Sequence, residues 1–189
     1  MKLAFDLKKT ALVLIDLQHG IVGLPVGPHS ASAVVRTCRD LAEAFRKKGS
    51  LVIFVRVDLN HVEPVRADVS LGDAAAGPPP VEASQIVPEA GMLSDDILLT
   101  KHHWGAFGKT GLEQLLHERG IDEIVLGGIA TNMGVESTAR QAVSLGFSVV
   151  VAEDACSSLS EEGHSFSMKN IFPLIARVRS CDEILNAIA

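Results

Sequence analysis

Two charged residues suited to chemistry each follow a run of apolar residues. Asp16 comes directly after residues 11–15, and Lys101 directly after residues 97–100. Partial burial would raise the pKa of Asp16, so that it exchanges a proton near neutral pH. Lys101 would pair with Asp16, hold it charged or orient a substrate. The simpler alternatives are a helix cap or salt bridge for Asp16 and a solvated side chain for Lys101.

A glycine-containing turn is the third candidate for chemistry. It lies in G-G-I-A-T-N-M-G-V-E-S-T-A-R, residues 127–140, between a buried-strand pattern and a helical pattern. Such a turn presents unpaired backbone amides at a helix N-terminus, which suits an anion or a developing oxyanion. The simpler interpretation is a tight loop in which glycine supplies backbone freedom and Asn132 caps the helix.

The segment after Lys101, H-H-W-G-A-F, contains both aromatic residues and histidines. Trp104 and Phe107 could wall an apolar pocket, or both could belong to the core. His102 and His103 point in different directions on an extended chain, so they cannot face one metal without a kink.

Elsewhere, Asp58 and His61 are three residues apart, with no second histidine at suitable spacing. We therefore expect no metal and no cofactor.

The elements that position these residues alternate along the chain. This alternation predicts an α/β fold: a doubly wound, parallel, six-stranded sheet flanked by helices in a Rossmann-like, three-layer arrangement. Ligands bind such sheets beyond the carboxyl ends of the strands, which is where the candidate residues lie. The expected strands are residues 11–15, 51–57, 97–100, 123–126, 148–152 and 175–178, and the expected helices are 32–48, 110–119, 133–144, 161–169 and 181–188.

Local glycine and proline patterns support this division of the chain. Gly49, Gly120 and Gly146 each follow a helical pattern and precede a strand, as C-terminal glycines of helices do. The exception to the alternation is residues 58–96, a long irregular excursion that includes G-P-P-P. Excursions of this length serve as lids, interface segments or mobile loops.

Composition restricts the class of protein. The 189 residues fit one domain, 1–189, and a 47% hydrophobic but 4% aromatic content indicates a core of Ala, Val, Leu and Ile. A net charge of −6 without a basic cluster argues against nucleic acid. We see no signal peptide and no membrane-length apolar run, so we expect a cytoplasmic protein.

Cys38, Cys156 and Cys181 form no CxxC pair, and none occupies a convincing nucleophile position.

In its motifs the chain resembles the isochorismatase-like (cysteine hydrolase) superfamily over nearly its whole length. The resemblance rests on Asp16 with Gln18 after it, on Lys101 followed by Ala106-Phe107 and Thr110, and on G-I-A-T-N leading to V-E-S-T-A-R. The segments 104–107, 153–155 and 177–180 are most similar to an uncharacterised bacterial branch. Most members use an Asp, Lys and Cys triad, and the position of that cysteine is Gly134 here.

The resemblance implies a chemistry without a covalent intermediate, because glycine has no side chain to attack carbon. Nicotinamidase and related amidase activities are therefore disfavoured. Isochorismatases keep the Asp and Lys, have glycine at this position and hydrolyse a vinyl ether. Breaking an enol ether needs a proton delivered to the methylene carbon. Asp16 would be this acid and Lys101 its partner, provided that burial outweighs the lowering of the carboxyl pKa by the lysine.

The resemblance also implies a substrate pocket and an assembly. The amides of Ala130 and Gly134 would line the pocket, after a cis peptide between Ile129 and Ala130, and a small-molecule substrate would bind in a homodimer or homotetramer. Two alternatives stay open: a hydrolase in which Asp16 activates water against an amide, and a non-catalytic ligand-binding protein. The expected substrate-binding residues are Gln18, Trp104, Phe107, Ile129, Ala130, Asn132 and Met133.

Overall fold

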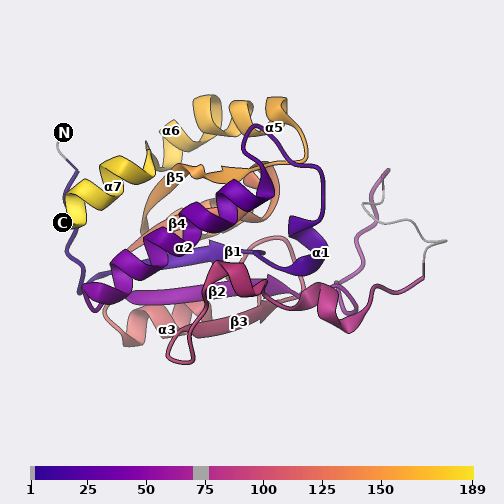
Figure 1. Ribbon diagram of the computed structural model, residues 1–189, viewed down its shortest axis with the longest axis horizontal. Helices are drawn as coiled ribbons and strands as arrows, with labels where there is room; N and C mark the ends of the chain where they lie inside the picture. Colours follow the sequence, from indigo (N-terminus) through magenta and orange to yellow (C-terminus); the bar gives the residue numbers. More distant parts are fainter. Residues whose placement is uncertain (1–2, 70–76) are drawn as a thin grey trace.

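The computed structural model describes residues 3–69 and 77–189 (Figure 1). Six strands form one sheet in the order β3-β2-β1-β4-β5-β6, and every neighbouring pair is parallel. The predicted doubly wound parallel sheet is therefore confirmed. The strands are β1 (Thr10–Ile15), β2 (Leu51–Val57), β3 (Ile97–Lys101), β4 (Glu123–Ile129), β5 (Ser148–Ser157) and β6 (Arg177–Arg179).

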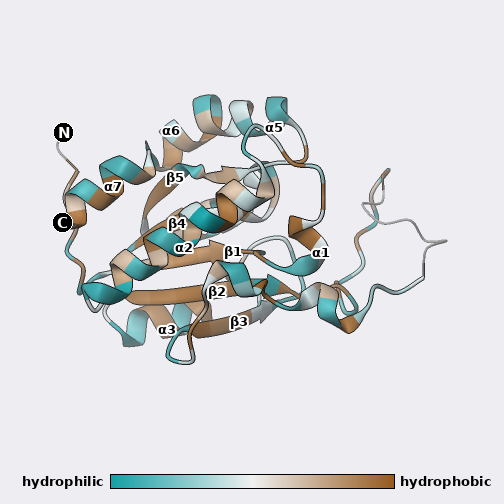
Figure 2. Cartoon of the chain, viewed as in Figure 1, coloured by the Kyte–Doolittle hydropathy of each residue, from teal (hydrophilic) through white to brown (hydrophobic). Residues whose placement is uncertain are grey.

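Helices cover both faces of the sheet and bury a separate core on each. Along β1, Leu12 and Leu14 face one cluster while Val13 and Ile15 face the other, as the alternation of a strand requires. Figure 2 shows that the central strands β1, β2 and β4 are mostly hydrophobic, which is typical of a sheet buried on both faces. One face packs against α2 (Ala31–Lys47) and α7 (Cys181–Ile188), and the other against α3 (Leu112–Glu118), α4 (Glu136–Ser144) and α6 (Phe172–Ile175).

Several predicted elements differ in their bounds from the structure, and β5 extends to Ser157 beyond the predicted 148–152. The helix expected at 133–144 is preceded by a wider π turn, η4 (Thr131–Val135), before α4 begins. The strand expected at 175–178 begins only at Arg177. Residues before it form α5 (Glu161–Phe166), η5 (Ser167–Ile171) and the single turn α6, in which a proline occupies the first turn, where its missing N–H costs nothing.

The glycines predicted to end helices are confirmed. Gly49, Gly120 and Gly146 have φ angles of 73°, 65° and 90°, in the left-handed region that favours glycine.

The excursion between β2 and β3 returns to the sheet in its second half. The short turn η2 (Val81–Ser84) lies beside α1 (His19–Val22), and η3 (Pro88–Ala90) lies beside α2. Between them, the N–H of Val87 donates to the carbonyl of Leu17 at 2.9 Å. Residues 62–69 extend away from the sheet (Figure 1). Residues 81–90 therefore help to enclose the end of β1.

Candidate functional site

The structure brings Asp16 and Lys101 together beyond the carboxyl ends of the strands. Lys101 Nζ lies 2.8 Å from Asp16 Oδ2, and the two side chains are only 2% and 8% exposed, respectively. Since β2 lies between β1 and β3, the lysine side chain reaches across the end of β2. The pair is therefore buried and held by two separate strands.

A close backbone approach shapes the chain at Asp16. Ile15 pairs with Gly128 of β4, where a Cβ would lie 2.1 Å from the carbonyl oxygen of Ile15. Only glycine fits at this position, which also has a φ of 126°. Asp16 itself has a φ of 53°, a conformation that is uncommon outside glycine and that clusters at functional sites. The aspartate thereby leaves the regular strand.

Burial decides the protonation of Asp16. Loss of hydration raises the pKa of its carboxyl from 3.8 to about 6, against the opposing charge and hydrogen bond of Lys101. Burial thus outweighs the lysine, which is the condition that acid catalysis required. A carboxyl with this pKa carries its proton in a substantial fraction of molecules at mildly acidic pH.

The two oxygens of Asp16 have different surroundings. Oδ2 accepts from Lys101, whose Nζ also donates to the carbonyl oxygen of Trp104 at 2.7 Å. Oδ1 is buried without a hydrogen-bond partner in the described parts of the chain. An unpaired buried polar atom is costly and rare, so it needs an explanation. Oδ1 is thus the Asp16 oxygen that the described residues leave without a competing hydrogen bond.

Gly134 lies directly beside this pair, in the turn η4. A Cβ built on it would lie 3.2 Å from both Asp16 Oδ2 and Lys101 Nζ, and 3.0 Å from Ile15 Cγ2. Any side chain at residue 134 would therefore touch both charged groups. Asp16 and Lys101 are thus in direct contact, and the Cβ direction of Gly134 points at both.

The residues around Gly134 line the same turn with different exposure. The peptide between Ile129 and Ala130 is cis, as the resemblance implied, and both residues are buried. Met133 is half-buried and packs against the core on the α2 side. Asn132 is exposed, and its Oδ1 accepts from Ser158 Oγ, so its side chain does not cap the following helix.

Gln18 makes three hydrogen bonds within the protein, and its expected role in binding substrate stays a prediction. Its Nε2 donates to the carbonyls of Val57 at 2.9 Å and Ala83 at 3.1 Å, and its Oε1 accepts from the N–H of Val57 at 2.8 Å. The side chain is completely buried. Gln18 therefore joins the end of β1 to β2 and to η2.

The two aromatic residues after Lys101 differ in their surroundings. Trp104 is 44% exposed, and it is its carbonyl that contacts Lys101. The ring of Phe107 packs against Phe147 with centroids 5.7 Å apart, and its N–H donates to Gln141. Because Phe147 immediately precedes β5, this contact lies toward the amino ends of the strands. Phe107 is therefore partly buried against the core, and its expected contact with substrate stays a prediction.

Sequence reasoning missed a polar group behind the Gly134 turn. Thr131 Oγ1 lies 2.8 Å from Nδ1 of His164 on α5, and both side chains are buried. The His164 ring meets the half-buried His29 edge-on, with centroids 5.8 Å apart. The pKa of His164 is lowered to about 4, first by burial and then by His29, so its imidazole is neutral at neutral pH. The sequence offers no signal for this contact, because it joins residues 33 positions apart.

The three cysteines are buried free thiols. Burial raises the pKa of Cys38, Cys156 and Cys181, that of Cys156 to about 12. A thiol rather than a thiolate is present in each case, which agrees with the expectation that none is a nucleophile.

The described residues offer few features outside this site. Asp58 Oδ2 and His61 Nδ1 are 2.9 Å apart on the surface, and the hydrogen bond to His61 lowers the pKa of Asp58. No third metal-binding side chain joins such a group within residues 3–69 and 77–189. Over the same ranges, no helix has the length and apolar character needed to span a bilayer.

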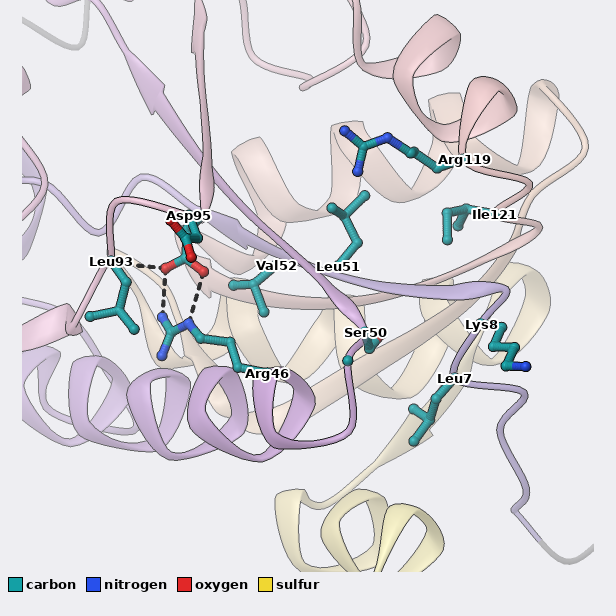
Figure 3. A pocket seen from close by; sticks show the side chains of 12 residues that line it. Leu7, Lys8, Arg46, Ser50, Leu51, Val52, Leu93, Asp95, Arg119 and Ile121 are labelled. Atoms are coloured by element: carbon teal, nitrogen blue, oxygen red, sulfur yellow. Dashed lines mark hydrogen bonds and ion pairs between the residues drawn. The ribbon is translucent and has the colours of Figure 1, made fainter.

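A cleft of about 420 Å³ lies at the opposite end of the sheet (Figure 3). Its lining includes Lys8, Ser50 and Ile121, which precede β1, β2 and β4. Arg46 in this cleft is bound by both carboxylate oxygens of Asp96, at 2.8 and 2.7 Å. Since its central cation is already paired, we assign the chemistry to Asp16 and not to this cleft.

Comparison with known proteins identifies the family. The isochorismatase domain model matches residues 10–183. The chain is 46% identical to the uncharacterised isochorismatase family protein YecD of Escherichia coli O157:H7, covering 98% of this chain and 100% of that protein. It is 40% identical to YwoC of Bacillus subtilis, covering 98% and 97%, respectively. An isochorismatase family structure from Burkholderia thailandensis superimposes with a TM-score of 0.91 at 40% identity, covering 100% of this chain and 99% of that one. Fold, motifs and relatives agree with the resemblance drawn from the sequence, and the chain belongs to the isochorismatase family of hydrolases.

Proposed function

We propose that this protein hydrolyses a small vinyl ether such as isochorismate, with Asp16 as the general acid and without a covalent intermediate. The observation that carries the proposal is the state of Asp16. Its carboxyl has a pKa raised to about 6, and its Oδ1 has no partner within the described residues. An acid catalyst needs both a proton near neutral pH and an oxygen free to deliver it.

The reaction follows from these two oxygens. Oδ1–H gives its proton to the terminal methylene carbon of the enol ether, and the double bond becomes an oxocarbenium ion. Water adds to this ion and returns a proton to Asp16, giving a hemiketal. The hemiketal breaks its C–O bond to release the alcohol and pyruvate, so that one water is consumed and no electrons are transferred.

Lys101 and Gly134 have supporting roles in the proposal. Lys101 fixes the orientation of Asp16 through Oδ2 and stabilises the carboxylate left after proton transfer. Gly134 keeps the space next to the pair open, because any side chain there would contact Asp16 and Lys101. The resemblance places the cysteine of related hydrolases at this position, and glycine excludes a covalent route through it. The amides of Ala130 and Gly134 would bind a polar group of the substrate.

The test is pyruvate release from isochorismate by the purified parent and by Asp16→Asn. This substitution preserves shape but removes the transferable proton, so we expect a loss of about 10²–10⁴-fold in kcat. Activity lost in the variant would support the proposal. Equal activity in both proteins would remove Asp16 from the acid role. A folded parent without activity would reject isochorismate and favour an amide substrate or a non-catalytic binding role.

A further inference from the structure

The turn that carries Gly134 is attached to the elements behind it on both sides of the glycine. Before Gly134, Thr131 Oγ1 lies 2.8 Å from His164 Nδ1, and Asn132 accepts from Ser158. After it, Ser167 Oγ donates to Glu136 Oε2 at 2.6 Å. The turn is therefore held by the end of β5, by α5 and by η5, none of which contains Asp16 or Lys101.

The contact between Thr131 and His164 is the buried member of this set. Thr131 is completely buried and His164 is 4% exposed, whereas Asn132 is exposed to solvent. Buried hydrogen bonds are the ones whose loss leaves an unsatisfied group behind, so this contact restrains the turn more than the others do.

Its place in the fold connects His164 to the reacting groups. Thr131 is the first residue of η4. A Cβ built on Gly134, in the same turn, would lie 3.2 Å from Asp16 Oδ2 and from Lys101 Nζ. Moving the start of the turn would change these distances. Displacements of about 1 Å in a catalytic site cost on the order of 100-fold in rate.

We propose that His164 is a positioning residue, which acts through Thr131 to fix the distance between the Gly134 turn and the Asp16–Lys101 pair. The inference rests on the proposed function only because catalysis by Asp16 makes that distance important. The geometry itself can be measured without turnover.

A thiol introduced by Gly134→Cys reports the position of the turn relative to the Asp16–Lys101 pair. The three native thiols have raised pKa values, so the introduced thiol is the one expected to ionise below about pH 8. Its pKa depends on its distances to Lys101, whose charge lowers it, and to the Asp16 carboxylate, whose charge raises it, so that a movement of the turn changes it. Far-ultraviolet absorbance of the thiolate reports this pKa as a function of pH.

In the Gly134→Cys protein, we expect Thr131→Val and His164→Leu each to shift the thiol pKa, changing the thiolate fraction at fixed pH by about tenfold. Thr131→Ser and His164→Asn, which keep polar atoms near the same positions, should restore it to within about threefold. Arg46→Met is the stability control, since it breaks an ion pair at the opposite end of the sheet and should leave the thiol unchanged.

Thiol pKa values that stay the same in Thr131→Val and His164→Leu would overturn the proposal. So would an equal shift in Arg46→Met, which would indicate general loosening. Failure of the parent to release pyruvate would reject the proposed function alone, because the thiol titration does not depend on catalysis.

Discussion

The raised pKa of Asp16 makes a quantitative prediction about stability. Asp16 holds its proton more tightly in the folded than in the unfolded protein, so folding takes up a proton between the two pKa values. The contribution of this pKa shift to the free energy of unfolding is fully present below about pH 4, and it is lost as pH rises through about 6. The difference between 3.8 and about 6 corresponds to roughly 3 kcal/mol of unfolding free energy.

Asp16→Asn isolates this contribution, because asparagine cannot ionise. We expect the stability of the variant relative to the wild type to increase as pH rises, whatever its constant offset. About half of the roughly 3 kcal/mol should appear between about pH 5 and about pH 7.5. Urea unfolding of both proteins at several pH values measures the difference, and subtraction removes the other titrating groups.

A stability difference that does not change with pH would refute the reasoning. It would mean that the carboxyl of Asp16 has the same pKa in the folded and unfolded protein. Burial would then not outweigh Lys101, and Asp16 would be almost fully ionised even at mildly acidic pH, unable to act as an acid.

Three further substitutions test other parts of the site. Lys101→Met leaves burial unopposed, so the pKa of Asp16 should rise above about 6 and shift the pH profile of stability upward; an unshifted profile would contradict the assigned ion pair. Gln18→Ala removes three buried hydrogen bonds and should cost about 3 kcal/mol in urea unfolding, whereas a loss below about 1 kcal/mol would argue against its joining role. Phe107→Leu should lower stability by about 1 kcal/mol and leave kcat/KM within about twofold; reduced activity at unchanged stability would place Phe107 in the substrate pocket.

The parts of the site that could be predicted from sequence are those fixed by the sheet. Asp16 and Lys101 follow apolar runs, and the carboxyl ends of parallel strands share one edge, so their proximity follows from the fold. Gly134 was found through a strand-to-helix turn. Position along a strand was enough for Asp16 and Lys101, whereas Gly134 needed the family resemblance as well.

The parts that could not be predicted depend on side-chain direction and distant contacts. Gln18 and Phe107 follow the right strands, but nothing in their neighbours shows that one binds the backbone of β2 and the other turns toward Phe147. The positive φ of Asp16 depends on the approach of Gly128 from another strand. His164 is 33 residues from Thr131 in the chain, and only the tertiary fold brings the two side chains together.

The pH dependence of kcat/KM for pyruvate release tests most directly whether Asp16 acts as the acid, because this parameter reports the ionisation of the free enzyme. We predict that kcat/KM falls as pH rises above about 6, approaching a tenfold loss for each pH unit, as the carboxyl of Asp16 loses its proton. A rate that stays constant or increases over this range would contradict acid catalysis by Asp16.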